Sequence, residues 1–64
     1  MTKTDMIAEA AAIRAALASL HDRIRVLSVA APKDASLLLA DVNCDLYKLL
    51  RSVEIVGLII GDEA

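Results

Sequence analysis

The sequence predicts an all-α fold, an antiparallel hairpin of two long helices that pairs with a second copy into a four-helix bundle. Three observations support this prediction: two apolar stripes with heptad spacing, a single proline between them, and an apolar content of 58% in a chain of only 64 residues. Residues three and four positions apart share one face of a helix, so heptad spacing is typical of helices that pack side by side.

The first predicted helix spans about residues 4–30 and is rich in alanine, the residue with the highest helix propensity. Thr2 and Thr4 are both suitable N-cap residues, and Asp5, three residues after Thr2, completes a capping-box pattern. The apolar stripe of this helix alternates steps of four and three through Met6, Ala10, Ile13, Leu17, Leu20, Ile24 and Leu27.

The second predicted helix spans about residues 35–60 and ends at Gly61, because glycine adopts the left-handed conformation that often terminates helices. The two helices make residues 1–64 a single domain. The stripe of the second helix alternates steps of three and four through Leu39, Val42, Leu46, Leu49, Val53, Val56 and Ile60.

Pro32 places the turn at about residues 31–34, because proline lacks a backbone donor and disfavours the helical conformation of Ala31. The second helix begins either with Pro32 as its first residue or with Asp34 as its N-cap. The residue numbers of facing residues in an antiparallel hairpin add to a constant. Six pairs between the two stripes, and the pair of Leu27 with Ala35, obey this rule to within one residue. Half of the constant lies beside the proline, so the stripes and the turn indicate the same hairpin.

The composition favours a homodimer. A chain this short cannot bury so many apolar residues alone, and a two-helix hairpin covers each stripe on one side only. The chain has no Phe, no Trp and one Cys, so we expect no intrachain disulfide, no structural zinc and no cofactor. Pairing of two hairpins with two-fold symmetry is the usual solution.

The charge pattern favours a cytoplasmic protein without membrane or nucleic-acid specialisation. Seven basic residues stand against nine acidic ones, which is not the basic excess of a typical nucleic-acid binder. Glu9 and Arg14 interrupt what would be the apolar core of a signal peptide. The apolar run Ile55–Ile60 is far shorter than a membrane-spanning helix.

A second, thinner apolar line on the second helix is the predicted binding surface for another protein. Tyrosine and arginine are enriched at protein-binding hot spots, and both occur on this line. No nucleophile–base pair and no glycine-rich phosphate loop occurs in the sequence, so we predict a non-enzymatic interaction protein of the regulator or inhibitor type. In a further alternative the same line joins copies into a self-assembling structural subunit. The predicted surface consists of Leu37, Cys44, Tyr47, Arg51, Ile55 and Leu58.

Arg14, His21 and Arg25 lie along one flank of the first helix and form the basis of a second functional hypothesis. Two such flanks in a dimer would make a basic strip that can meet phosphates. In length, hairpin layout and its Met-Thr-Lys start, the chain resembles the Rop-type plasmid copy-number regulators, a resemblance that implies a hairpin dimer that binds RNA. The aromatic residue expected on an RNA-reading face is missing from this helix, so a solvated flank is the simpler interpretation.

Overall fold

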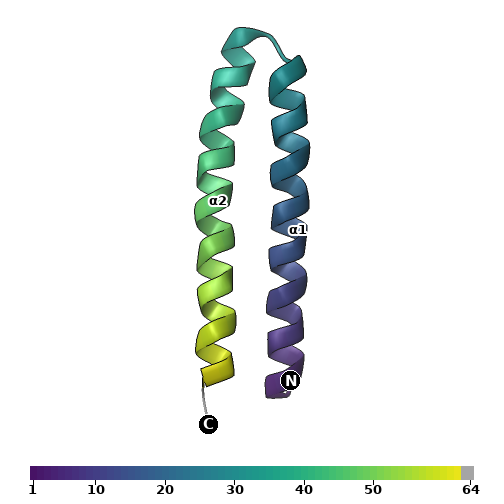
Figure 1. Ribbon diagram of the computed structural model, residues 1–64, viewed down its shortest axis with the longest axis vertical. Coiled ribbons are helices and arrows are strands. Elements are labelled where there is room, and N and C mark those ends of the chain that lie inside the picture. The colour runs from purple at the N-terminus through teal and green to yellow at the C-terminus, as the bar shows by residue number, and fades with distance from the viewer. Residues whose placement is uncertain (63–64) are drawn as a thin grey trace.

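The computed structural model describes residues 1–62 as two antiparallel α-helices, α1 (Lys3–Ala30) and α2 (Lys33–Asp62), which lie side by side over their whole lengths (Figure 1). The N-terminus and the end of α2 lie at one end of the hairpin and the turn lies at the other. The Cα atoms extend over 49 × 14 × 13 Å. The predicted all-α hairpin is therefore confirmed, while residues 63 and 64 of the predicted domain lie outside the described part of the chain.

A capping box starts α1. The hydroxyl of Thr2 accepts a hydrogen bond from the backbone N–H of Asp5 at 3.1 Å, and the Asp5 carboxylate accepts one from the backbone N–H of Thr2 at 3.2 Å. These two bonds satisfy backbone donors that have no partner inside the helix. Thr2 is thus the N-cap in preference to Thr4, and α1 begins one residue earlier than predicted.

The turn is short because Pro32 ends α1 on one side and accepts the first backbone hydrogen bond of α2 on the other. Ala31 is extended, with φ −81° and ψ 157°, as expected for the residue before a proline, and its N–H still donates to the carbonyl oxygen of Leu27. The carbonyl oxygen of Pro32 accepts from Ser36 N–H at 2.8 Å, so Pro32 itself is the N-cap of α2. Neither predicted start of α2 is therefore right, and Asp34 lies inside the first turn.

The predicted stop at Gly61 is wrong, because α2 continues through this glycine to Asp62. No glycine among residues 1–62 has a positive φ, so no left-handed cap is formed there. Glycine tolerates the helical conformation as well as the left-handed one, and each further helical residue adds a backbone hydrogen bond.

Small and polar residues take part in the contact between α1 and α2. The hydroxyls of Ser28 and Ser36 are hydrogen-bonded at 3.0 Å, and the Asn43 side-chain N–H₂ donates to the carbonyl oxygen of His21 at 3.3 Å. Ala10 is the one buried residue among the described residues, at 8% exposure. Half-buried residues along the same line are Leu17, His21, Ile24 and Ser28 on α1, and Ser36, Leu39, Asn43, Leu46, Leu50, Val53, Gly57 and Ile60 on α2.

The predicted stripes coincide with this contact line only in part. Ala10, Leu17 and Ile24 of the α1 stripe do line it, but the members between them turn away from α2. The physical reason is that small and hydrogen-bonding side chains let the helices approach, which rotates each helix relative to the apolar stripe. The stripe residues left exposed are Met6, Ile13, Leu20 and Leu27 on α1, and Val42, Leu49 and Val56 on α2.

Candidate interaction faces

Two exposed flanks border the contact line, one on each side. If the contact line is written as heptad positions a and d, His21 and Asn43 occupy a, and Leu17 and Leu46 occupy d. Because the helices run in opposite directions, the g positions of both helices lie on one flank and the e positions of both lie on the other.

The g flank is apolar over the whole length of the molecule. All eight of its residues are apolar, and the seven large ones are between 37% and 56% exposed. At its outer border the charged and polar residues Glu9, Arg23, Asp45 and Ser52 are interspersed with apolar ones, which are Ala16, Ala30, Leu38 and Ile59. We call the eight residues the aliphatic face: Met6, Ile13, Leu20, Leu27, Ala35, Val42, Leu49 and Val56.

The aliphatic face exposes apolar surface whose burial against a partner would contribute a large binding free energy. Together the exposed fractions of its seven large side chains correspond to about three fully exposed residues. Complete removal of that surface from water would contribute roughly 5–10 kcal/mol per chain. A continuous apolar surface of this extent is typical of a binding interface.

The six residues predicted to bind another protein lie away from the aliphatic face and are all exposed. Tyr47 takes an e position beside the contact line, Ile55 points directly away from α1, and the other four lie between them on α2. Cys44 is a free, exposed cysteine rather than a packed one. We call these six residues the Tyr47 face: Leu37, Cys44, Tyr47, Arg51, Ile55 and Leu58.

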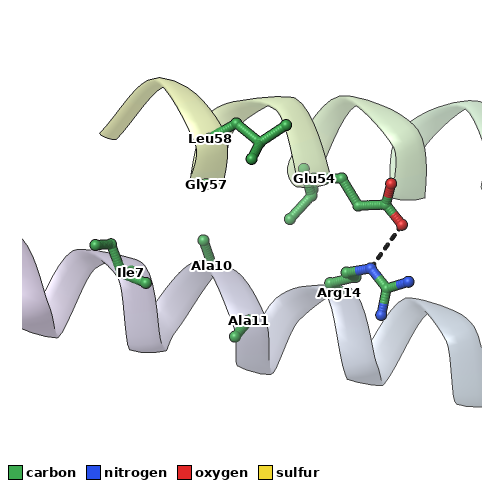
Figure 2. Close-up of a pocket in the computed structure, with 8 residues that line it drawn as sticks. Ile7, Ala10, Ala11, Arg14, Glu54, Gly57 and Leu58 are labelled. Carbon is green, nitrogen blue, oxygen red and sulfur yellow. Dashed lines mark hydrogen bonds and ion pairs between the residues drawn. The ribbon is translucent and has the colours of Figure 1, made fainter. Parts of the chain in front are cut away.

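An open groove between the helices adjoins the Tyr47 face through Leu58 (Figure 2). Ala10 points at Gly57 across the groove, and Ile7 and Ala11 extend its apolar lining on α1. One end of the groove is charged, because Arg14 Nε donates to Glu54 Oε1 at 2.7 Å.

The three residues of the RNA hypothesis lie on or beside the e flank, but their charges are unequal. Arg14 is paired with Glu54, whose second oxygen lies 3.7 Å from Arg51 Nη1. Arg25 is exposed, and the His21 ring lies against the Tyr47 ring with centroids 6.5 Å apart and planes tilted by 56°.

The contact between His21 and Tyr47 does not follow from the flank of the first helix alone, because Tyr47 belongs to α2. The antiparallel pairing of the e flanks is the signal that would have revealed it. The structure thus brings an aromatic side chain to the flank on which none was expected.

The aliphatic face and the Tyr47 face are the main candidates for a functional site in this protein. No three His, Cys, Asp or Glu side chains within residues 1–62 are arranged to hold a metal ion. Neither helix, over the same residues, contains a stretch that is both long and apolar enough to cross a membrane. Comparison of the chain with protein families, with curated proteins and with solved structures gives no match.

Proposed function

We propose that this protein is a non-enzymatic interaction protein that works as a homo-oligomer and binds another protein. The observation that supports this function is the presence of two separate exposed apolar faces on a hairpin with one buried residue among residues 1–62. A dimer that covers the aliphatic face leaves the Tyr47 face available for a second protein. The protein would then act as a regulator or inhibitor by occupying a surface of its partner.

The different compositions of the two faces support this division of roles. The aliphatic face contains only aliphatic residues, as the cores of permanent interfaces do. The Tyr47 face mixes Tyr47 and Arg51 with smaller apolar residues, a composition typical of hot spots in separable complexes. The proposal places the protein in the cytoplasm, where the exposed thiol of Cys44 stays reduced.

A pull-down with the wild type and with Tyr47→Asp tests the proposed function. The aspartate places a charge in the centre of the Tyr47 face without touching the aliphatic face, and we expect a specifically bound protein to be lost. Ser19→Asp is the matched control, because Ser19 is exposed on the side of α1 away from both faces. An identical set of bound proteins for wild type and Tyr47→Asp, with helicity and mass unchanged, would contradict the assignment of this face.

RNA binding is a second candidate function, which the position of Tyr47 beside His21 favours. An aromatic pair next to Arg25 combines a surface on which a base can stack with a cation that can meet a phosphate. We expect a salt-sensitive gel shift with RNA that disappears in the Arg14→Ala/Arg25→Ala double variant. Absence of any shift at low salt would exclude this function.

Self-assembly through the Tyr47 face is the structural alternative to binding of another protein. It predicts species larger than a dimer whose fraction rises with protein concentration. Sedimentation velocity over a range of concentrations distinguishes self-assembly from binding of another protein. A regulator that uses this face for a different protein does not form species larger than the dimer when it is purified alone.

A further inference from the structure

We propose that a second copy of this chain covers the aliphatic face with its turn at the opposite end, so that α1 lies antiparallel beside α1 of the second copy and α2 beside its α2. This inference rests on the proposed homo-oligomer. It goes further by naming the face, the orientation and the register of the dimer. Three features of the hairpin support this arrangement: the apolar length of the face, the pairing of residues along each helix, and the position of the symmetry axis along both helices.

The length of the face suits a stable dimer. The hairpin is 49 Å long in Cα positions, and the aliphatic residues follow both helices, from Met6 to Leu27 and from Ala35 to Val56. Their seven large side chains are between 37% and 56% exposed. A second hairpin laid along this face therefore meets apolar surface throughout.

The α1 part of the face can pair with the α1 part of a second copy when Ala16 is the centre of the pairing. When α1 lies antiparallel to its copy with Ala16 opposite Ala16, Glu9 of one chain lies opposite Arg23 of the other. The two-fold symmetry makes this ion pair twice. In the same register, to within one residue, the aliphatic residues pair with one another, Ile13 with Leu20 and Met6 with Leu27.

The α2 part of the face can pair with the α2 part of a second copy when Leu49 is the centre of the pairing. In the antiparallel register that places Leu49 opposite its copy, Asp45 lies opposite Ser52 to within one residue, and no two like charges meet. The apolar residues again pair with apolar ones, Val42 with Val56 and Leu38 with Ile59. Leu38 and Ile59 are both more than half exposed in the single hairpin, and this pairing gives each of them an apolar neighbour.

In such a dimer a single two-fold axis passes α1 and α2 at the same distance along the hairpin, and the hairpin meets this condition. Ala10 lies across from Gly57, and His21 is hydrogen-bonded through its carbonyl to Asn43. The midpoints between these contacts fall near residue 16 on α1 and next to Leu49 on α2. The self-pairing of α1 and the self-pairing of α2 depend on different residues, yet both are centred on this one axis.

The alternative dimer, with both turns at the same end, pairs the residues less well. It places α1 beside α2 of the second copy, which brings Arg23 opposite Asp45 but sets Glu9 against Ile59. Each arrangement gives Arg23 one acidic partner, so the difference lies in the acidic residue that is left over. In the alternative dimer Glu9 faces the apolar Ile59, whereas in the proposed dimer Asp45 faces the polar Ser52. The arrangement with turns at opposite ends is therefore the one that the residues favour.

Cysteine cross-linking tests the arrangement directly. In a Cys44→Ala background, Ala16→Cys places two thiols at the proposed axis, and oxidation is expected to give a covalent dimer on a non-reducing gel. Ser52→Cys in the same background is the matched control, because Ser52 lies away from the axis and stays uncrosslinked. Cross-linking only in a mixture of the two variants would instead indicate the dimer with turns at the same end and overturn the proposal.

Charge exchange provides a second, independent readout. Glu9→Arg sets two arginines against each other at two places, and we expect it to weaken the dimer about tenfold at low salt. The double variant Glu9→Arg/Arg23→Glu restores the pairs and the affinity. Sedimentation measures both, with Lys48→Glu, which lies away from the aliphatic face, as control. Weakening by Asp45→Arg but not by Glu9→Arg would overturn the proposed orientation.

These tests are separable from the test of the proposed function. A dimer that does not cross-link through Ala16→Cys contradicts the arrangement while leaving homo-oligomerisation intact. A monomer at all concentrations contradicts both. Binding of a second protein depends on Tyr47 and is measured in a separate assay.

Discussion

Replacement of Asn43 with leucine is expected to stabilise the protein even though it removes a hydrogen bond. The Asn43 side chain is half-buried against α1, where its N–H₂ group donates to the His21 carbonyl oxygen at 3.3 Å. Its own oxygen is buried without a hydrogen-bond partner. A leucine at this position removes the unpaired acceptor and adds apolar contact with α1.

The magnitude follows from opposing contributions. Loss of the hydrogen bond costs about 0.5–1.5 kcal/mol, whereas relief of a buried unpaired polar atom gains about 1–3 kcal/mol. The His21 carbonyl keeps its partner inside α1, the backbone N–H one turn later. The net stabilisation is therefore about 1 kcal/mol per chain before apolar burial is added, which corresponds to a rise in Tm of about 4–8 °C.

Thermal and urea unfolding followed by far-UV circular dichroism measures this effect. The protein concentration is held constant, because the Tm of an oligomer depends on it. Asn43→Asp is the matched control, since it keeps the shape of the side chain but brings a charge to the half-buried position and lowers stability. If Asn43→Leu unfolds at a lower temperature than the wild type, the reasoning about the unpaired oxygen is wrong.

Three further substitutions test the local structure by the same unfolding assay. Thr2→Ala removes the capping box and should cost about 1 kcal/mol, and an unchanged Tm would contradict the cap. Gly57→Ala should stabilise α2 by up to about 1 kcal/mol, because the added Cβ would lie at an ordinary 3.9 Å from the Ala10 Cβ; destabilisation would mean a tighter contact. Glu54→Gln should change stability by less than about 1 kcal/mol, because Arg14 is 51% exposed, and a larger loss would indicate a stronger pair.

The hairpin itself could be predicted from the sequence because its determinants are local. Heptad spacing identifies helices, Pro32 cannot continue one, and Thr2 followed by Asp5 starts one. Each of these signals acts within a few residues, and the structure confirms both helices and the capping box at Thr2. The stop at Gly61 was wrong, because the same residue type is compatible with both ending and continuing a helix.

The contact line could not be predicted as easily, because the most apolar stripe was assumed to face the neighbouring helix. In the structure polar or small residues take six of the eight a positions of that line, among them His21, Ser28, Asn43 and Gly57. Their recurrence at intervals of seven was a signal in the sequence. An apolar stripe that is wider than a two-helix contact indicates instead the core of a larger bundle.

The interaction faces were partly accessible from the sequence. The residues of the Tyr47 face share one side of a helix by their spacing alone, and the structure leaves all of them exposed. The groove beside Leu58 and the contact of Tyr47 with His21 depend on both helices, so they follow only from the packed hairpin. What binds to this face stays a prediction.

Sedimentation equilibrium at micromolar concentration tests the central claim most directly, because burial of the aliphatic face by a second copy doubles the mass. We expect a helical species with the mass of two 6.8 kDa chains, and dissociation when Leu49→Asp places charges at the symmetry axis. A fully helical monomer of 6.8 kDa at the same concentration would contradict it, because the aliphatic face would then be stable in water.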